Sequence, residues 1–133
     1  MGEQTINDKQ SNNSRIKIQA INVNSLVSLN RRYDLDLFLK KNLPDIIAIS
    51  ETKLNKKHNL MFDGYQIFRS KRADGGGGGT ALLVKKNIIC SQIKLSKKYK
   101  ILECTVTKIK LKANKFLFII SAYASPSIQS KKI

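Results

Sequence analysis

The sequence has few of the residue types that build zinc sites and disulfide-stabilised domains. It contains no tryptophan, one histidine and two cysteines, Cys90 and Cys104. It has neither a CxxC pair nor a second histidine, and this excludes a zinc site of the usual Cys/His spacing. Two cysteines are also too few for a disulfide framework, so they favour a reducing compartment.

Long apolar runs and acidic residues are scarce as well. No run approaches the roughly 18 apolar residues that cross a bilayer, and Met1 to Ser14 holds no apolar signal segment. We therefore expect an intracellular protein, nuclear or cytoplasmic, that is neither secreted nor embedded in a membrane. Only 9 Asp and Glu stand against 25 Lys and Arg, a net charge of +16. This charge favours nucleic acid as partner, and an anionic membrane surface less.

The apolar content is sufficient for one packed domain. Hydrophobic residues make up 41% of the 133 residues, which is too many for a disordered chain and fits a single small domain. We expect a flexible polar tail over residues 1–14, a folded domain over 15–127 and a basic terminal segment over 128–133.

The apolar pattern predicts one helix and six or seven strands. Apolar residues follow helical spacing over 31–42, and Pro44 blocks continuation of the helix. The helix joins predicted strands over 15–23 and 46–50, so the chain opens with a βαβ unit and a parallel strand pair. Further strands are predicted over 65–69, 80–85, 88–95, 101–111 and 116–123. The fold class is α+β, with a mixed β-sheet and a flanking helix.

The last two strands carry more detailed expectations. The apolar phase shifts within 101–111, which suggests a bulge or bend, and Ala113-Asn114 is predicted to form a hairpin turn. The run Phe116–Ile120 is apolar on both sides of the pleat, so we expect it to be buried on both faces. A single helix cannot cover such a sheet on both sides, so one layer is missing from the predicted elements.

Polar side chains follow two of the predicted strands where each strand ends. The apolar run over 46–50 leads directly to Glu51, and the strand over 15–23 leads to Asn22 and Asn24. Ends of parallel strands meet at one edge of a sheet, where ligands bind in many α/β folds. Taken alone, the same residues also fit a solvated strand end or a turn.

Five segments occur in a fixed order along the chain. They are 22–26 (Asn-Val-Asn-Ser-Leu), 44–54 (Pro-Asp-Ile-Ile-Ala-Ile-Ser-Glu-Thr-Lys-Leu), Gly64-Tyr65, the glycine run 75–79 leading into 80–85, and 122–126 (Ala-Tyr-Ala-Ser-Pro). The series resembles the amino-terminal half of an endonuclease/exonuclease/phosphatase domain, which is deoxyribonuclease I-like. Within that superfamily it is most similar to the apurinic-type endonuclease of non-LTR retrotransposons. The resemblance implies about half of a four-layer α/β sandwich, and a Mg²⁺-dependent phosphodiesterase that nicks DNA and is associated with reverse transcriptases.

The resemblance also implies roles for individual residues. Glu51 matches the metal-binding glutamate and Tyr123 the tyrosine near the scissile phosphate. Asn22 matches the asparagine that positions the phosphate, and it is expected to bind the metal together with Glu51. The ion would be Mg²⁺ or Mn²⁺, whose oxygen ligands these residues can supply, and no small-molecule cofactor is implied. Asn24 falls where related DNA-repair enzymes often carry an acid. The predicted DNA contacts are Asn24, Lys53, Arg69 and Arg72.

Some parts of the family pattern are absent. After Tyr123 the chain has no Asp, Glu or His, so the carboxyl-terminal half with its catalytic base is missing, and His58 does not match the catalytic histidine. We therefore expect a truncated, inactive fragment; the alternative is a small basic nucleic-acid-binding module without catalysis. The run Gly75–Gly79 lacks the spacing of a phosphate-binding loop and predicts a flexible hairpin connection.

Overall fold

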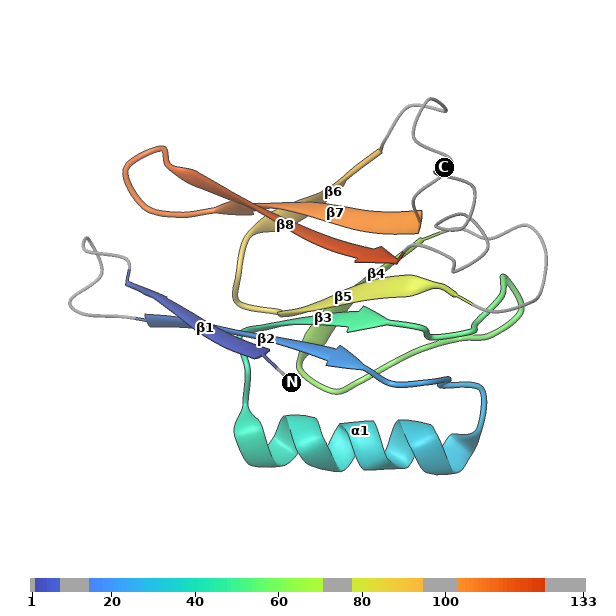
Figure 1. Cartoon of the computed structure of the whole chain (residues 1–133). Helices are drawn as coiled ribbons and strands as arrows, with labels where there is room; N and C mark the ends of the chain where they lie inside the picture. Colours follow the sequence, from blue (N-terminus) through green and yellow to red (C-terminus); the bar gives the residue numbers. More distant parts are fainter. Residues whose placement is uncertain (1, 8–14, 71–77, 95–102, 124–133) are drawn as a thin grey trace.

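The computed structural model describes residues 2–7, 15–70, 78–94 and 103–123, and these form three layers. In Figure 1 the helix α1 (Leu29–Asn42) lies under a five-stranded sheet, and a three-stranded sheet lies above it. The strand order is β1-β2-β3-β5-β4 in the first sheet and β6-β7-β8 in the second. The predicted α+β class, with a mixed sheet and a flanking helix, is confirmed. The strands are β1 (Gly2–Asn7), β2 (Arg15–Asn22), β3 (Ile46–Ser50), β4 (Tyr65–Arg69), β5 (Thr80–Lys85), β6 (Cys90–Ile93), β7 (Glu103–Lys110) and β8 (Phe116–Tyr123).

The described chain contains the predicted βαβ unit. β2 and β3 pair in parallel, with Asn22 opposite Ser50 at their carboxyl ends. The connecting α1 begins earlier than predicted because Ser28 caps it: the Ser28 Oγ accepts a hydrogen bond of 3.2 Å from the Arg31 backbone N. The helix ends just before Pro44, as predicted.

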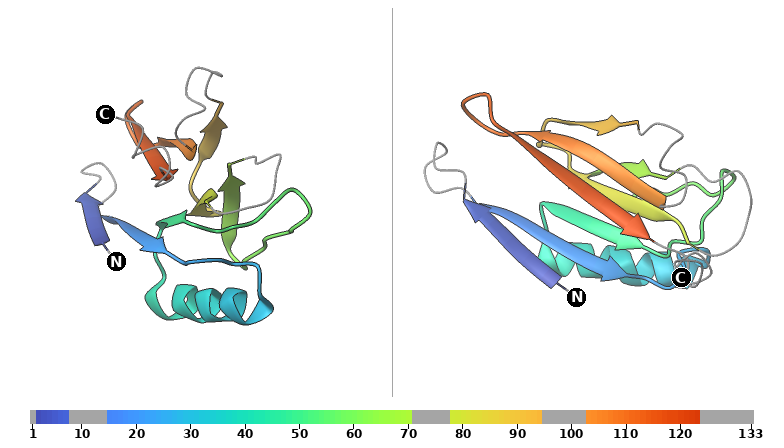
Figure 2. Two further views of the ribbon diagram at one scale, coloured as in Figure 1. Left: turned by 45° about the vertical axis from the view of Figure 1, so that its right-hand side comes forward. Right: turned by 45° about the horizontal axis from the view of Figure 1, so that its top comes forward.

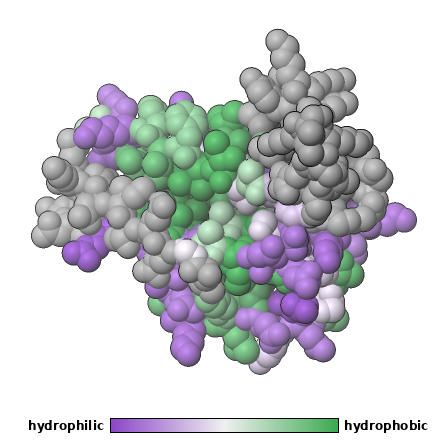
Figure 3. Space-filling model, viewed as in Figure 1, coloured by the Kyte–Doolittle hydropathy of each residue, from purple (hydrophilic) through white to green (hydrophobic). Residues whose placement is uncertain are grey.

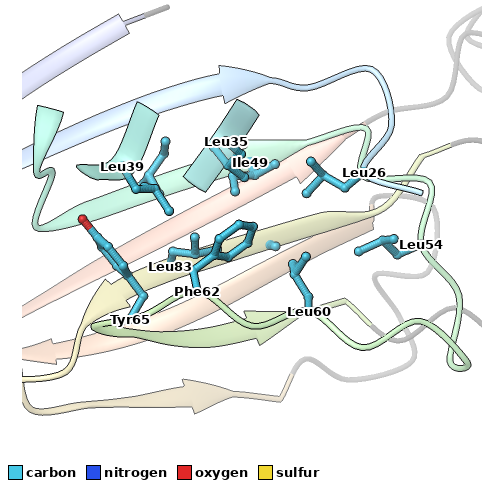
Figure 4. Close-up of a cluster of buried hydrophobic side chains, with 11 residues drawn as sticks. Leu26, Leu35, Leu39, Ile49, Leu54, Leu60, Phe62, Tyr65 and Leu83 are labelled. Carbon is cyan, nitrogen blue, oxygen red and sulfur yellow. The ribbon is translucent and has the colours of Figure 1, made fainter. Parts of the chain in front are cut away.

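The larger core lies between α1 and the face of the first sheet that α1 covers. Figure 4 shows Leu35 and Leu39 of α1 pointing toward Ile49 and Leu83 of the sheet. Phe62 closes the cluster from the loop before β4. All five side chains are buried, and each such burial contributes roughly 1.5–3 kcal/mol. The helix is therefore held by packing, and it fixes β2 and β3 relative to each other.

The opposite face of the first sheet packs against the second sheet (Figure 2). Four fully buried side chains make this contact: Ile46, Leu82, Val84 and Ile109. Hydrogen bonds also cross between the sheets. The hydroxyls of Thr80 and Thr105 lie 2.9 Å apart, and the Ser121 hydroxyl donates to the Ile49 carbonyl at 2.9 Å. The first bond joins β5 to β7, and the second brings the end of β8 over the end of β3.

The amino-terminal residues differ from the predicted flexible tail. Gly2–Asn7 form β1, which pairs antiparallel with β2, Gly2 lying opposite Ala20. An edge strand carries unpaired N–H and C=O groups, and β1 satisfies those of β2. The prediction is therefore wrong for residues 2–7, while 8–14 and 128–133 lie outside the described residues.

The hairpin of the second sheet confirms one prediction and corrects another. Ala113 and Asn114 have φ angles of 57° and 56° and form the predicted turn, because two left-handed residues suit a tight hairpin. β7 and β8 pair residue for residue along their whole length, so the predicted bulge is absent from β7. The apolar pattern shifts because β7 carries buried apolar residues on both faces. Ile109 lies on the face toward the first sheet, and Val106 lies on the opposite face.

The apolar run of β8 is exposed on one face, contrary to prediction. Phe116, Phe118 and Ile120 are 46%, 57% and 60% exposed, while Leu117 and Ile119 face the first sheet. In Figure 3, hydrophobic side chains gather over the upper sheet where β8 lies. No described residue covers these three side chains, and Lys108 only partly shields them, its Nζ lying 4.0 Å from the centre of the Phe116 ring. One outer layer is thus lacking from the described part of the chain.

A first prediction concerns Tyr65, which is part of the core between α1 and the first sheet. Its hydroxyl donates a buried hydrogen bond of 2.6 Å to the Pro44 carbonyl. Tyr65→Phe leaves that carbonyl without this partner and should lower the free energy of unfolding by about 1–3 kcal/mol. Burial, and to a smaller extent Asp45, raises the pKa of Tyr65. The unfolded chain therefore loses this proton first, and the wild type loses stability as pH rises through about 10.

Urea unfolding of both proteins at neutral and alkaline pH checks this. The difference in free energy of unfolding between wild type and Tyr65→Phe should be largest near pH 7. It should shrink above about pH 10, because only the wild type has this proton to lose. Equal stability of the two proteins at pH 7 would show that the Tyr65–Pro44 bond contributes nothing.

Candidate functional site

The predicted polar residues meet at one end of the molecule. β2 ends at Asn22, opposite Ser50, and Glu51 follows Ser50 directly. Ser50 in turn lies opposite Thr80, the first residue of β5. In Figure 1 the arrowheads of β2, β3 and β8 all point to the right-hand side, where these residues lie. The structure thus brings the side chains predicted from two strands, Asn22 and Glu51, to the same sheet edge.

The two asparagines are held by hydrogen bonds to their oxygens. The Asn22 Oδ1 accepts from the Asn24 backbone N at 3.0 Å, and the Asn24 Oδ1 accepts from Lys53 Nζ at 3.0 Å. Each amide therefore turns its Nδ2 group, a pure donor, toward its surroundings. This arrangement suits Asn22 to donate to a phosphate oxygen more than to coordinate a cation.

Glu51 lies in an unusual stretch of backbone. Its φ is 57°, and Asn24, Ser25 and Lys53 also have positive φ values, of 48°, 100° and 56°. The Glu51 carbonyl accepts from the Ser25 N at 2.7 Å, which ties this segment to the loop after β2. Non-glycine residues in this region cost on the order of 1–3 kcal/mol each and gather at functional sites. The half-buried Glu51 side chain is thus presented by a strained, cross-linked turn.

Two glycines hold the segment after Glu51. The Thr52 N donates to the Gly79 carbonyl at 3.2 Å, and the Lys53 N donates to the Gly78 carbonyl at 2.7 Å. Both glycines are buried and have φ near 90°. The prediction of a flexible connection is therefore wrong for these two residues, while 75–77 lie outside the described residues.

Tyr123, the last residue of β8, lies at the same end of the molecule. It pairs with Glu103, and the Glu103 Oε2 accepts a hydrogen bond of 2.8 Å from the Gly79 N. Tyr123 is half-buried. Sequence analysis missed Glu103, because a single acid at the start of a strand carries no recognisable pattern.

A groove runs between the two sheets beside these residues. It has a volume of about 640 Å³ and is open to solvent. β2, β3 and β8 supply its lining, and Asn22 and Ser50 lie at the end next to Glu51. The lining residues are Ala20, Ile21, Asn22, Ala48, Ser50, Ile120, Ser121 and Ala122.

The predicted basic contacts are only partly at this site. Lys53 is exposed there, but Arg69 donates from both terminal nitrogens to backbone carbonyls, to His58 at 2.6 Å and to Asn55 at 2.9 Å. Burial, and to a smaller extent the Arg32 charge, lowers the pKa of Arg69. Arg69 therefore holds the loop before β4, and Arg72 lies outside the described residues.

Comparison with known proteins assigns this chain to a family. The model of the Endonuclease/Exonuclease/phosphatase family matches residues 20–124, most of the chain. The chain belongs to the endonuclease/exonuclease/phosphatase family. This confirms the resemblance seen in the sequence at the level of the superfamily. No curated protein matches the chain.

Solved structures share the fold of this endonuclease/exonuclease/phosphatase chain. The AP endonuclease LMAP from Leishmania major is 20% identical with a TM-score of 0.60, over 80% of this chain and 39% of that one. The human Nocturnin catalytic domain with bound sulfate is 15% identical with a TM-score of 0.57, over 92% and 53%. D. rerio TDP2, complexed with a single-strand DNA product, is 20% identical with a TM-score of 0.54, over 86% and 48%. The chain therefore spans about half the length of these structures.

The strand ends offer few ligands for a divalent cation. Among the described residues, no three His, Cys, Asp or Glu side chains gather into a group that could hold a metal. Glu51 supplies one carboxylate, which fits Mg²⁺, an ion that keeps several waters and takes few protein ligands. Within the same residues, α1 is neither long nor apolar enough to cross a membrane.

Proposed function

We propose that residues 15–127 form the amino-terminal half of a Mg²⁺-dependent phosphodiesterase that nicks DNA, of the retrotransposon type and acting in the nucleus or cytoplasm. One observation carries the proposal in a chain of this family. Asn22 lies opposite Ser50 at the ends of two parallel strands, and Glu51 directly follows Ser50. This places a carboxylate and an amide donor at one sheet edge, as a phosphodiester site requires.

Each residue has a separate task in this proposal. Glu51 would hold the cation, Mg²⁺ or Mn²⁺, which when bound polarises a phosphoryl oxygen. Asn22 donates from Nδ2 to a phosphate oxygen, since its Oδ1 is engaged by the Asn24 backbone. Lys53 and Asn24 form a pair whose donors face an incoming backbone phosphate. Tyr123 would add a hydroxyl from the last position of β8, next to Ala122 of the groove lining.

The activity belongs to a longer protein in this proposal. The chain spans 39% to 53% of the three solved structures described above. His58, the single histidine, accepts at Nδ1 from the Asn55 N at 3.0 Å and serves the loop before β4. With His58 held in that loop, the described residues offer no further histidine as a general base. The 133 residues alone are therefore expected to be inactive, with the general base supplied by a carboxyl-terminal half.

A supercoiled-plasmid assay tests the proposed activity. The chain extended by the sequence that follows it should convert supercoiled plasmid to the nicked circle in Mg²⁺, and EDTA should stop the reaction. The 133-residue chain should leave the plasmid supercoiled. Nicking by the extended protein that continues in EDTA would contradict the proposal.

The DNA-contact role of Lys53 gives a second prediction. Lys53→Gln removes one cation beside Asn24 and should reduce the salt dependence of DNA binding by about one unit of slope in a plot of log K against log salt concentration. Fluorescence anisotropy with labelled duplex DNA measures the slope. Lys41→Gln is the matched control, because Lys41 is exposed in the last turn of α1, at the opposite end of the molecule. Equal slopes for both variants would remove Lys53 from the DNA contact.

A small basic DNA-binding module without catalysis is the second candidate. The net charge of +16 favours it, because charge alone supports non-specific binding to DNA. The two candidates differ in the plasmid assay, since a module of this kind would bind the plasmid and leave it intact even when extended.

A further inference from the structure

The Glu103 carboxylate, at the start of β7, contacts the residue before β5 and has no role in the proposed chemistry. Its Oε2 accepts a hydrogen bond of 2.8 Å from the Gly79 N, across 24 positions of sequence. Glu103 begins β7 in the second sheet, whereas Gly79 immediately precedes β5 in the first. A carboxylate acceptor makes this bond about twice as strong as one between neutral groups. The two sheets are thereby joined next to the site.

Gly79 passes this constraint on to the segment that follows Glu51. Its carbonyl accepts from the Thr52 N, and the preceding Gly78 carbonyl accepts from the Lys53 N. Both bonds are backbone to backbone, so they fix the chain direction and not merely a side chain. They hold Thr52 and Lys53, the residues directly after Glu51, whose φ of 57° needs support from its neighbours.

Gly79 is packed closely against residues 52 and 53, with no space for a side chain on that side. It is buried with φ 92°, and a Cβ on it would collide with the Thr52 Oγ1 and lie 3.3 Å from the Lys53 N. A close-packed contact transmits a displacement instead of absorbing it. Gly79 therefore connects the Glu103 carboxylate to Thr52 and Lys53, the two residues that follow Glu51.

The same segment is tied to the loop after β2. The Ser25 N donates to the Glu51 carbonyl at 2.7 Å, and the Leu26 N donates to the Thr52 carbonyl at 2.8 Å. One continuous series of hydrogen bonds therefore runs from Glu103 through Gly79 to Thr52 and on to the Asn22 loop.

We propose that Glu103 is a positioning residue of the candidate site: through Gly79 it fixes residues 51–53 and so directs the Glu51 carboxylate and Lys53 toward the substrate phosphate. The inference rests on the proposed function for the meaning of that direction. We call this connection, from Glu103 through Gly79 to residues 51–53, the clamp. It requires neither metal nor substrate. Glu103 does not touch the reacting groups in this account.

Amide hydrogen exchange, followed by NMR on the 133-residue chain, tests the clamp. In Glu103→Ala the Thr52 and Lys53 amides should exchange on the order of tenfold faster relative to amides inside β3. Glu103→Gln keeps an oxygen acceptor without the charge and should restore part of the protection. Unchanged protection in Glu103→Ala would overturn the proposal, as would a loss in Glu103→Gln equal to that in Glu103→Ala.

Thr105→Val is the matched control for a general loss of stability. Thr105 lies two residues further along the same face of β7, and its hydroxyl interacts with the hydroxyl and the carbonyl of Thr80, which lies outside residues 51–53. Its replacement should speed exchange evenly across the sheets. Selective loss at Thr52 and Lys53 in this control would overturn the clamp. If Glu51→Gln nicks plasmid as well as the extended wild type, the proposed activity fails, and the exchange result still decides the clamp.

Discussion

Glu51→Gln is expected to reduce Mg²⁺-dependent nicking by the extended protein on the order of a thousandfold. Glu51 is the carboxylate that follows β3, directly after Ser50, which lies opposite Asn22 in the parallel strand pair. Gln has nearly the same shape, so the fold should be unaffected while the negative charge is lost. Charge stabilisation by a bound metal contributes several kcal/mol to phosphoryl transfer, and each 1.4 kcal/mol, roughly, is a factor of ten.

The measurement is the initial rate of plasmid nicking at saturating Mg²⁺. Asp63→Asn is the matched control, because Asp63 is an exposed acid just before β4. β4 begins opposite Lys85, at the end of the sheet away from Thr80 and Glu51. The control should retain the wild-type rate. A Glu51→Gln protein as active as the Asp63→Asn control would remove Glu51 from the active site.

Gly79→Ala is expected to have the largest effect on stability. The alanine would adopt φ 92°, a conformation that L residues rarely occupy, and its Cβ would collide with the Thr52 Oγ1. Backbone strain and overpacking each cost about 1–3 kcal/mol, so the free energy of unfolding should fall by roughly 2–6 kcal/mol. Urea unfolding measures this change.

Gly64→Ala separates the two causes. Gly64 also has positive φ, 83°, but an added Cβ there meets nothing within 4 Å. This variant should therefore lose only the strain component, on the order of 1–3 kcal/mol. If the two alanine variants unfold at the same urea concentration, the close packing of Gly79 against Thr52 does not contribute, and the clamp on residues 51–53 is looser than described.

The sequence was sufficient to predict the opening of the fold because its signals are local. Helical spacing over 31–42, the break at Pro44 and the isoleucine run of β3 each depend on neighbouring residues. The parallel pairing of β2 and β3 follows from them, and with it the meeting of Asn22 and Glu51. The superfamily was recognisable for the same reason, since its segments occur in order along the chain.

The features that the sequence did not predict depend on residues far apart in the chain. β1 forms because β2 has an open edge, which no pattern within Gly2–Asn7 announces. Glu103 and Gly79 interact across 24 positions. Arg69 has the charge of a DNA contact, and only the structure shows both of its terminal nitrogens engaged by loop carbonyls. In each case the deciding partner is set by tertiary packing.

The exposed side chains of β8 illustrate another limit. The run Phe116–Ile120 has the composition of a strand buried on both faces. Its outward residues are exposed because no described element lies over the second sheet. The sequence pattern is thus consistent with a longer protein in which a further layer covers this face, in keeping with the proposal that this chain supplies half of a domain.

Glu51 is expected to bind one divalent cation next to the Asn22 loop, which holds the phosphate. Titration of the isotope-labelled 133-residue chain with Mn²⁺, which broadens the NMR signals of nearby amides, tests it most directly. Broadening should be strongest for residues 22–25 and 51–53 together, and Glu51→Gln should abolish it. Broadening centred on other acids, such as Asp36 of α1, or unchanged by Glu51→Gln, would contradict the account.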